Sequence, residues 1–226
     1  MKPFLSIVIP VRDEGEKLLD SLLSLDYMLS LSEFSYECIC VCSRKAESSI
    51  KVCEKFSKLV KYMRVCEIKG ACGWRELFLE GMHSARGNVR MFLDPGIISV
   101  FIDREKILER LREGYECIIA IDEDIEEGEY KEPNSIPKMI VFGEEMLPTI
   151  EKKHIISHDR RSLLVEIIGF LLKNKIKIYA FPLPMKEKTK VNETLFDKFV
   201  NKTKLMRVKR EHKRITRERK KMNLSI

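Results

Sequence analysis

Short apolar runs alternate with amphipathic segments along the first 185 residues, and this alternation constrains the fold more than any other feature. The runs LSIVIP (5–10), YECICVC (36–42) and CIIAI (117–121) are typical of strands covered on both faces. Between the first two runs, leucines recur at helical spacing: Leu18, Leu22, Leu25 and Leu29. The alternation predicts one α/β domain with a mainly parallel central sheet and helices on both faces.

The composition is that of a soluble globular protein, with 44% apolar and 34% charged residues among 226. No apolar run approaches the roughly 18 residues needed to span a bilayer, and the amino terminus lacks a signal-peptide pattern. Cys38, Cys40 and Cys42 alternate along one expected strand. This spacing favours small core residues in a reducing cytoplasm over a zinc site. We therefore expect a cytoplasmic protein.

The basic residues are concentrated near the carboxyl terminus. Residues 202–221 contain eleven Lys or Arg and two Glu, a net charge of +9, whereas the whole chain carries +7. We expect a domain over residues 1–188 and a basic, helical extension over 189–226. A cationic amphipathic helix there would place the protein peripherally on an anionic membrane surface. The alternatives are a helix docked on its own body or on a second subunit, and contact with nucleic acid, which we do not favour.

Three blocks of sequence have distinctive patterns of apolar residues, glycines and acids. The first is SIVIPVRDEGEKLLDSLLSL (6–25), a strand, an acidic turn and a leucine-rich helix. The second is EGMHSARGNVRMFLD (80–94), with G-x-x-x-A-x-G spacing before a strand that ends in aspartate. The third is VEIIGFLLKNKIKIYAFPL (165–183). Together they resemble the family 2 glycosyltransferases, and the third resembles the dolichyl-phosphate mannose and glucose synthases among them.

The resemblance covers residues 3–190 and implies a Rossmann-like, three-layer GT-A fold. It implies transfer of a hexose from a UDP- or GDP-linked sugar to an acceptor, which in this branch is a polyprenyl (dolichyl) phosphate. The sequence departs from the pattern in four places: Cys42-Ser43 for Asp-Asp, Asp94-Pro95-Gly96 for Asp-x-Asp, Asp122-Glu123-Asp124 for Gly-Ser-Arg, and Lys188 for an arginine. The alternative is therefore a catalytically degenerate protein that binds nucleotide or a partner.

The resemblance places the donor across the carboxyl ends of the first, second and fourth strands. The residues that would bind the nucleotide are Pro10, Arg12, Asp13, Glu14, Ser43 and Arg75. Asp94 would act in catalysis and hold Mg²⁺ or Mn²⁺, since Mg²⁺ needs only one or two carboxylates beside substrate phosphates. The structural alternatives are helix-start charges for Asp13 and Glu14, a surface position for Arg75 and a turn cap for Asp94.

The segment HIISHDRRS (154–162) gathers candidate acceptor residues ahead of an expected helix. The candidates are Asp159 and Arg160 for catalysis, and Arg161, with Lys188 further along the chain, for phosphate binding. A phosphate acceptor is already an anionic nucleophile and needs only arginines to position it. A hydroxyl acceptor would need a base, either Asp159 or His158. The alternative is an exposed helix start with Ser157 or Asp159 as its N-cap.

Overall fold

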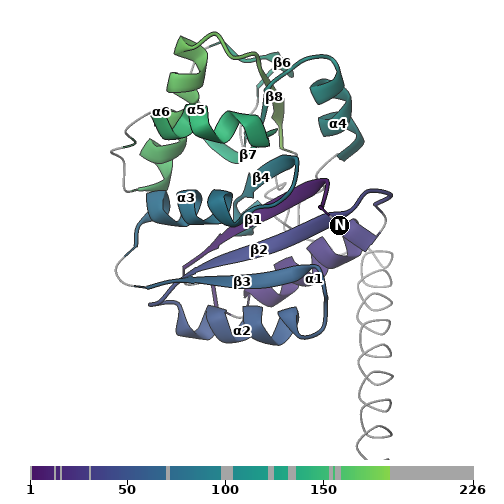
Figure 1. The fold of residues 1–226 in the computed structure, drawn as a ribbon, viewed down its shortest axis with the longest axis vertical. Helices are drawn as coiled ribbons and strands as arrows, with labels where there is room; N and C mark the ends of the chain where they lie inside the picture. Colours follow the sequence, from purple (N-terminus) through teal and green to yellow (C-terminus); the bar gives the residue numbers. More distant parts are fainter. Residues whose placement is uncertain are drawn as a thin grey trace, which may run out of the picture. The chain divides into compact units, whose positions relative to one another are not determined.

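The computed structural model describes residues 2–12, 14–15, 17–30, 32–69, 72–97, 104–121, 125–131, 136–152, 155 and 159–183, without the side chains of residues 104 and 160. Within them the chain forms one mixed α/β domain (Figure 1). Its strands are β1 (Leu5–Val11), β2 (Tyr36–Ser43), β3 (Met63–Ile68), β4 (Val89–Leu93), β5 (Cys117–Ile121), β6 (Gly128–Glu129), β7 (Pro137–Gly143) and β8 (Ile178–Pro182).

The helices follow the strands in the predicted alternation. They are α1 (Lys17–Ser30), α2 (Glu47–Ser57), α3 (Trp74–Ser84), α4 (Arg104–Arg112), α5 (Leu147–Lys152) and α6 (Arg160–Lys173). Short 3₁₀ turns follow β4 (Pro95–Ile97) and β7 (Glu144–Met146). The predicted boundary at residue 188 and the predicted extension over 189–226 lie outside the described residues and stay predictions.

The eight strands form one sheet in the order β3-β2-β1-β4-β7-β5-β8-β6. The pairs β1–β2, β1–β4, β2–β3 and β5–β8 are parallel, as the sequence predicts. Strand β7 instead runs antiparallel between β4 and β5. No described helix lies between β5 and β7, and helical crossovers are what usually make neighbouring strands parallel.

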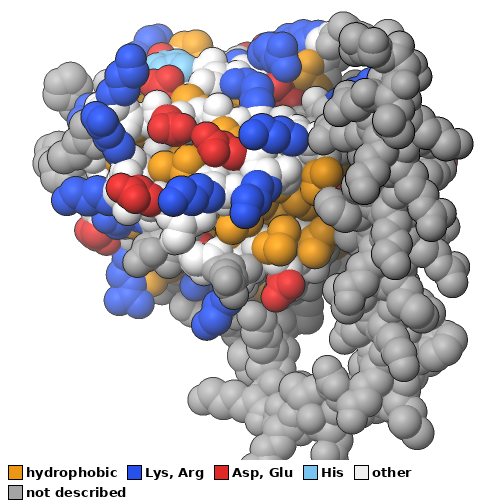
Figure 2. Space-filling model, turned by 90° about the horizontal axis from the view of Figure 1, so that it is seen from below, with side chains coloured by type: hydrophobic (Ala, Val, Ile, Leu, Met, Phe, Trp, Pro, Cys, Tyr) orange, Lys and Arg blue, Asp and Glu red, His pale blue; other side chains and the backbone are white. Residues whose placement is uncertain are grey.

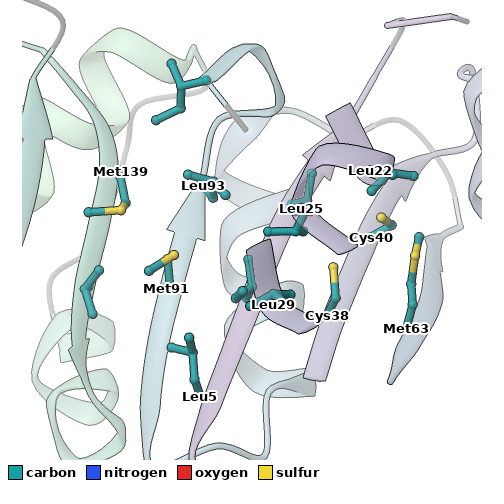
Figure 3. Close-up of a cluster of buried hydrophobic side chains, with 14 of the residues drawn as sticks. Leu5, Leu22, Leu25, Leu29, Cys38, Cys40, Met63, Met91, Leu93 and Met139 are labelled. Atoms are coloured by element: carbon teal, nitrogen blue, oxygen red, sulfur yellow. The ribbon is translucent and has the colours of Figure 1, made fainter. Parts of the chain in front are cut away.

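Alternate side chains of the central strands build two cores. Ile7 and Ile9 of β1 pack with Cys38, Cys40 and Cys42 of β2 against α1, α2 and α4. Figure 3 shows Cys38 and Cys40 beside the leucines of α1. Val8 of β1 and the alternate residues of β2 face α3, α5 and α6. The three-layer prediction is therefore confirmed. All seven cysteines are free, and those on β2 are fully buried, as expected for core residues.

The glycine block before β4 is explained by close packing. A Cβ at Gly81 of α3 would overlap the side chain of Val8 and lie 2.8 Å from Val41 Cγ2. A Cβ at Gly87 would lie 2.7 Å from the backbone nitrogen of Ser6. The G-x-x-x-A-x-G spacing thus brings α3 and the start of β4 against β1.

A buried charge lies at the amino-terminal edge of the sheet. The Glu37 carboxylate accepts hydrogen bonds from the Ser6 hydroxyl (2.6 Å), the Arg86 backbone N–H (2.7 Å) and Arg86 Nη2 (3.0 Å). Arg64 Nε donates to the same carboxylate at 3.3 Å. Burial acts to raise the pKa of Glu37, but these hydrogen bonds and the Arg64 charge outweigh it and lower the pKa. The network joins β1, β2, β3 and the segment before β4.

On the face seen from below the view of Figure 1, the described surface carries both positive and negative side chains. Lys and Arg side chains are interspersed there with Asp and Glu around an apolar patch (Figure 2). This mixture agrees with the small net charge that remains when residues 202–221 are excluded. Among the described residues, none of the helices has the length and apolar content to cross a membrane.

Candidate active site

The carboxyl ends of β1, β2 and β4 lie together at one edge of the sheet. Val11, the last residue of β1, pairs with Cys42 of β2. On its other side β1 pairs in parallel with β4, so the residue after β4, Asp94, reaches the same edge. Ligands of open α/β sheets bind at this edge. Pro10 and Ser43 are buried there, and Arg12 is exposed.

Asp94 is buried, with 8% of its surface exposed, although it directly follows a strand. Its Oδ1 accepts a hydrogen bond from the Gly96 N–H (2.8 Å), and its carbonyl accepts one from Ile97 (3.1 Å). Its own N–H donates to the Lys138 carbonyl of β7 (2.9 Å). Asp94 Oδ2 lies 3.9 Å from Lys138 Nζ. Asp94 therefore caps the Pro-Gly turn, and its second oxygen faces an ammonium group.

Glu14 provides a second carboxylate near this edge. Its Oε2 accepts a hydrogen bond from the Arg12 backbone N–H (2.8 Å), which closes the turn between β1 and α1. The Gly15 N–H donates to the Ser49 hydroxyl of α2 (3.0 Å) and fastens the same turn. Burial raises the pKa of Glu14, and the negative charge of Asp94 adds to the rise. The two carboxylates are thus close enough to interact electrostatically.

Arginines and an aromatic ring lie at the start of α3. The Arg12 guanidinium is 5.9 Å from the centre of the Trp74 ring. Arg75 Nη1 lies 3.6 Å from Glu76 Oε1, and Glu76 also accepts a hydrogen bond from the Gly73 N–H (2.7 Å). Arg75 Nε is buried and makes no hydrogen bond to another described residue. Arg75 is therefore held beside Glu76 at the start of α3.

The segment before α6 forms a helix cap. Asp159 accepts a hydrogen bond from the Ser162 backbone N–H (3.0 Å), and this bond lowers its pKa. Asp159 and Arg161 are exposed, and among the described residues no hydrogen bond or ion pair joins either one to Asp94. Asp13, His158, Lys188 and the Arg160 side chain lie outside the described residues.

The described residues fit a protein-held divalent ion poorly. No group of three His, Cys, Asp or Glu side chains among them could hold a metal. Asp94 already binds the Gly96 N–H and faces Lys138, and Gly96 supplies no second carboxylate. A divalent ion at this edge would therefore depend mainly on the phosphate oxygens of a bound donor.

Lys138 is the residue of this edge that the sequence did not reveal. The run KMIVF (138–142) predicts a strand but does not give its direction. Only the antiparallel pairing of β7 with β4 brings the start of β7 beside the end of β4. The apolar pattern contains no signal for that pairing.

Comparison with known proteins yields structural matches only. No family model matches the sequence, and no curated protein matches it. A nucleotidyl transferase from Methanothermobacter thermautotrophicus matches with a TM-score of 0.55 and 14% identity over 91% of this chain and 99% of that one. TarS from S. aureus, in complex with UDP-GlcNAc, matches with a TM-score of 0.52 and 15% identity over 86% and 62%.

The mannosyltransferase PcManGT from Pyrobaculum calidifontis, in complex with GDP-Man and Mn²⁺, matches with a TM-score of 0.54 and 11% identity over 83% of this chain. The fold is GT-A-like. This chain spans only 62% of the TarS structure and 59% of PcManGT, whereas it spans almost all of the nucleotidyl transferase. At identities this low the likeness establishes the architecture, and the function rests on the site itself.

Proposed function

We propose that this protein transfers a hexose from a UDP- or GDP-linked sugar to an acceptor. The observation that carries the proposal is the buried Asp94 carboxylate at the carboxyl end of β4, beside the ends of β1 and β2. The resemblance of three sequence blocks to family 2 glycosyltransferases supports it. Structural neighbours that bind UDP-GlcNAc or GDP-Man add support at the level of the fold.

The donor would lie across this edge with its nucleoside near the turn after β1. Pro10, Arg12, Asp13, Glu14 and Ser43 are the proposed nucleoside contacts. Arg75, at the start of α3, would bind the diphosphate through its partly exposed guanidinium group, together with the helix-terminal N–H groups. Asp94 and the Gly96 turn would position the sugar-phosphate end.

A divalent ion, Mg²⁺ or Mn²⁺, would neutralise charge on the leaving diphosphate. We propose that Asp94 supplies its protein ligand and the donor phosphates supply most of the remainder. Such a site binds metal weakly when empty and more tightly once the nucleotide is present.

The acceptor that fits this chain best is one that arrives already ionised. Asp159 is engaged as a helix cap and has a lowered pKa, so it is a weak general base. A phosphate acceptor needs no base, only cations that position it. We propose that Arg160, Arg161 and Lys188 have this role toward a polyprenyl (dolichyl) phosphate, with Asp159 orienting the start of α6.

The basic segment 202–221 would bring the protein to such a lipid acceptor. A net charge of +9 over twenty residues favours binding to anionic headgroups on the cytoplasmic face of a membrane. Attachment would then be peripheral. No role in nucleic-acid binding is proposed.

A second candidate is a degenerate GT-A-like protein that binds nucleotide or a partner without transferring sugar. The observations that favour it are Gly96 at the second acidic position and Cys42-Ser43 at the end of β2. Such a protein would keep the fold and lose turnover.

Thermal unfolding with nucleotides tests the proposal. A ligand present at 100 times its Kd stabilises the native state by about 2.7 kcal/mol, or about 5–10 °C for a domain of this size. We expect such a shift with UDP, GDP or one of their sugars, and none with ADP as the control. A shift with CTP alone would favour nucleotidyl transfer. No shift with any nucleotide, with or without Mn²⁺, would refute donor binding.

A further inference from the structure

Lys138 places a positive charge beside the single acid that follows β4. The Leu93–Met139 pair joins β4 to β7, and these two residues lie on neighbouring strands in Figure 3. The next backbone hydrogen bond, from Asp94 N–H to Lys138 O, fixes Lys138 opposite Asp94. The Lys138 side chain is 29% exposed, so its ammonium group is only partly hydrated.

The geometry leaves the ammonium group of Lys138 able to bind an anion. Its distance of 3.9 Å from Asp94 Oδ2 is short enough for attraction but longer than a hydrogen bond. An ammonium group has three N–H donors, and that of Lys138 makes no hydrogen bond to another described residue. A phosphate oxygen that entered this edge could therefore be bound by Lys138 while Asp94 holds the ammonium group in place.

The charges of the site can be compared with those of a two-carboxylate site. Two carboxylates with a divalent cation have a net charge of zero, and so have Asp94 and Lys138. Where the resemblance expects a second aspartate, the chain has Gly96, whose N–H binds Asp94. The Asp94–Lys138 pair by itself therefore has the net charge of a metal-loaded two-carboxylate site without a divalent ion.

We propose that Lys138 binds the donor diphosphate and substitutes for much of the charge that a divalent metal would supply. This inference rests on the proposed function. Donor binding then persists without metal and depends on a cation at position 138. A fixed ammonium group in a partly dry site stabilises developing negative charge in the same way as other preorganised cations.

The test is titration calorimetry of UDP and GDP in EDTA and in excess Mn²⁺. For the wild type we expect binding to persist in EDTA, with an affinity no more than about tenfold below that in Mn²⁺. In EDTA, Lys138→Met should weaken binding about tenfold or more, which is about 1.4 kcal/mol. Lys138→Arg should recover most of the loss because it restores the charge. Mn²⁺ should improve binding to Lys138→Met more than to the wild type.

Lys106→Met is the matched control. The Lys106 side chain is 28% exposed, close to the 29% of Lys138, and it is paired with Glu127. We expect this change to leave nucleotide affinity within twofold. Circular dichroism establishes that each variant is folded, and Lys138→Gln replaces the Met variant if that variant unfolds.

Three outcomes would overturn the inference. Wild-type binding that requires Mn²⁺ would show that Lys138 does not substitute for metal, while leaving the proposed function intact. Equal affinities of wild type and Lys138→Met in EDTA would exclude a contact with the diphosphate. A wild type that binds no nucleotide under either condition would reject the proposed function together with this inference.

Discussion

Replacing Glu37 with glutamine tests whether the charge network at the amino-terminal edge is a structural element separate from the donor site. The Glu37 side chain is only 5% exposed, and it accepts five hydrogen bonds from Ser6, Arg64 and Arg86 at 2.6–3.3 Å. Glutamine preserves the shape and one acceptor oxygen. It removes the negative charge that both guanidinium groups face.

The expected cost follows from the exposure of the partners. Breaking a buried ion pair costs about 3–5 kcal/mol when the remaining charge has no access to water. The Arg64 and Arg86 side chains are 36% and 68% exposed, so water compensates for part of the loss. We therefore expect Glu37→Gln to destabilise the domain by about 2–3 kcal/mol at pH 7.

The pH dependence has a definite sign. The pKa of Glu37 is lowered in the folded protein from its ordinary 4.5. Its contribution to the free energy of unfolding is therefore fully present above pH 4.5 and is lost as the pH falls through the folded-state pKa. Glu37→Gln should lack this acid-dependent loss, so the stability difference between wild type and variant should shrink in acid.

Urea unfolding followed by circular dichroism measures the effect. With a slope of about 2–3 kcal/mol/M, the midpoint should fall by about 1 M. Glu33→Gln, at an exposed position near the same strand, should change stability by less than about 0.5 kcal/mol. Nucleotide affinity of folded Glu37→Gln should match the wild type. An unchanged midpoint, or a lost affinity without lost stability, would refute the reasoning.

Four further changes test the site, the packing and the basic segment. Asp94→Asn should weaken UDP or GDP binding in Mn²⁺ about tenfold by calorimetry and shift the thermal midpoint by only a few degrees; unchanged affinity would make Asp94 solely a turn residue. Glu14→Gln should flatten the fall in stability that the raised pKa predicts as pH increases above 4.5, and a pH profile identical to wild type would contradict the burial argument. Gly81→Ala should destabilise by about 1–3 kcal/mol in urea because its Cβ would overlap Val8, although alanine stabilises an open helical position; a stabilised variant would disprove the contact. Deleting residues 202–226 should abolish sedimentation with anionic liposomes, and unchanged sedimentation would favour a docked helix.

The secondary structure was predictable because burial leaves a periodic record in the sequence. The alternation of Ile7, Val8 and Ile9 between two covered faces produces an unbroken apolar run. The leucine spacing of α1 corresponds to its buried stripe, Leu18, Leu22, Leu25 and Leu29. Periodicity gives the type of an element, but it does not give the direction of a strand. For that reason the antiparallel course of β7 was not predicted.

The candidate site was predictable only in part. Asp94 could be found because a lone acid after an apolar strand falls at a ligand-binding edge. Asp159 was a candidate base in the sequence, but a hydrogen bond three residues along the chain makes it a helix cap. Lys138 had no local signal because its role depends on a neighbour 44 residues away in sequence. Electrostatic neighbours across a sheet require the topology, which the sequence alone does not provide.

The sequence blocks shared with family 2 glycosyltransferases indicate the fold, whereas the residues at the carboxyl edge of the sheet determine the chemistry. The glycines of the G-x-x-x-A-x-G block are required by close packing against the sheet, where Gly81 contacts Val8 and Val41 and Gly87 contacts Ser6. Matching that block therefore indicates the fold and does not test the chemistry. The chemistry depends on the carboxyl edge, where this chain has Cys42-Ser43 and Gly96 at positions that the family pattern fills with acids.

Among the described residues, the departures from the family pattern are Cys42-Ser43 and Gly96, and both change the charge of the site in the same direction. Each removes negative charge from the donor edge, and Lys138 adds positive charge beside Asp94. The acidic triplet 122–124, which replaces Gly-Ser-Arg of the family pattern, has the opposite sign and lies outside the described residues. A donor edge with fewer carboxylates attracts a divalent ion less and a diphosphate more. Direct binding of the diphosphate by side-chain cations is therefore the chemistry that this edge favours.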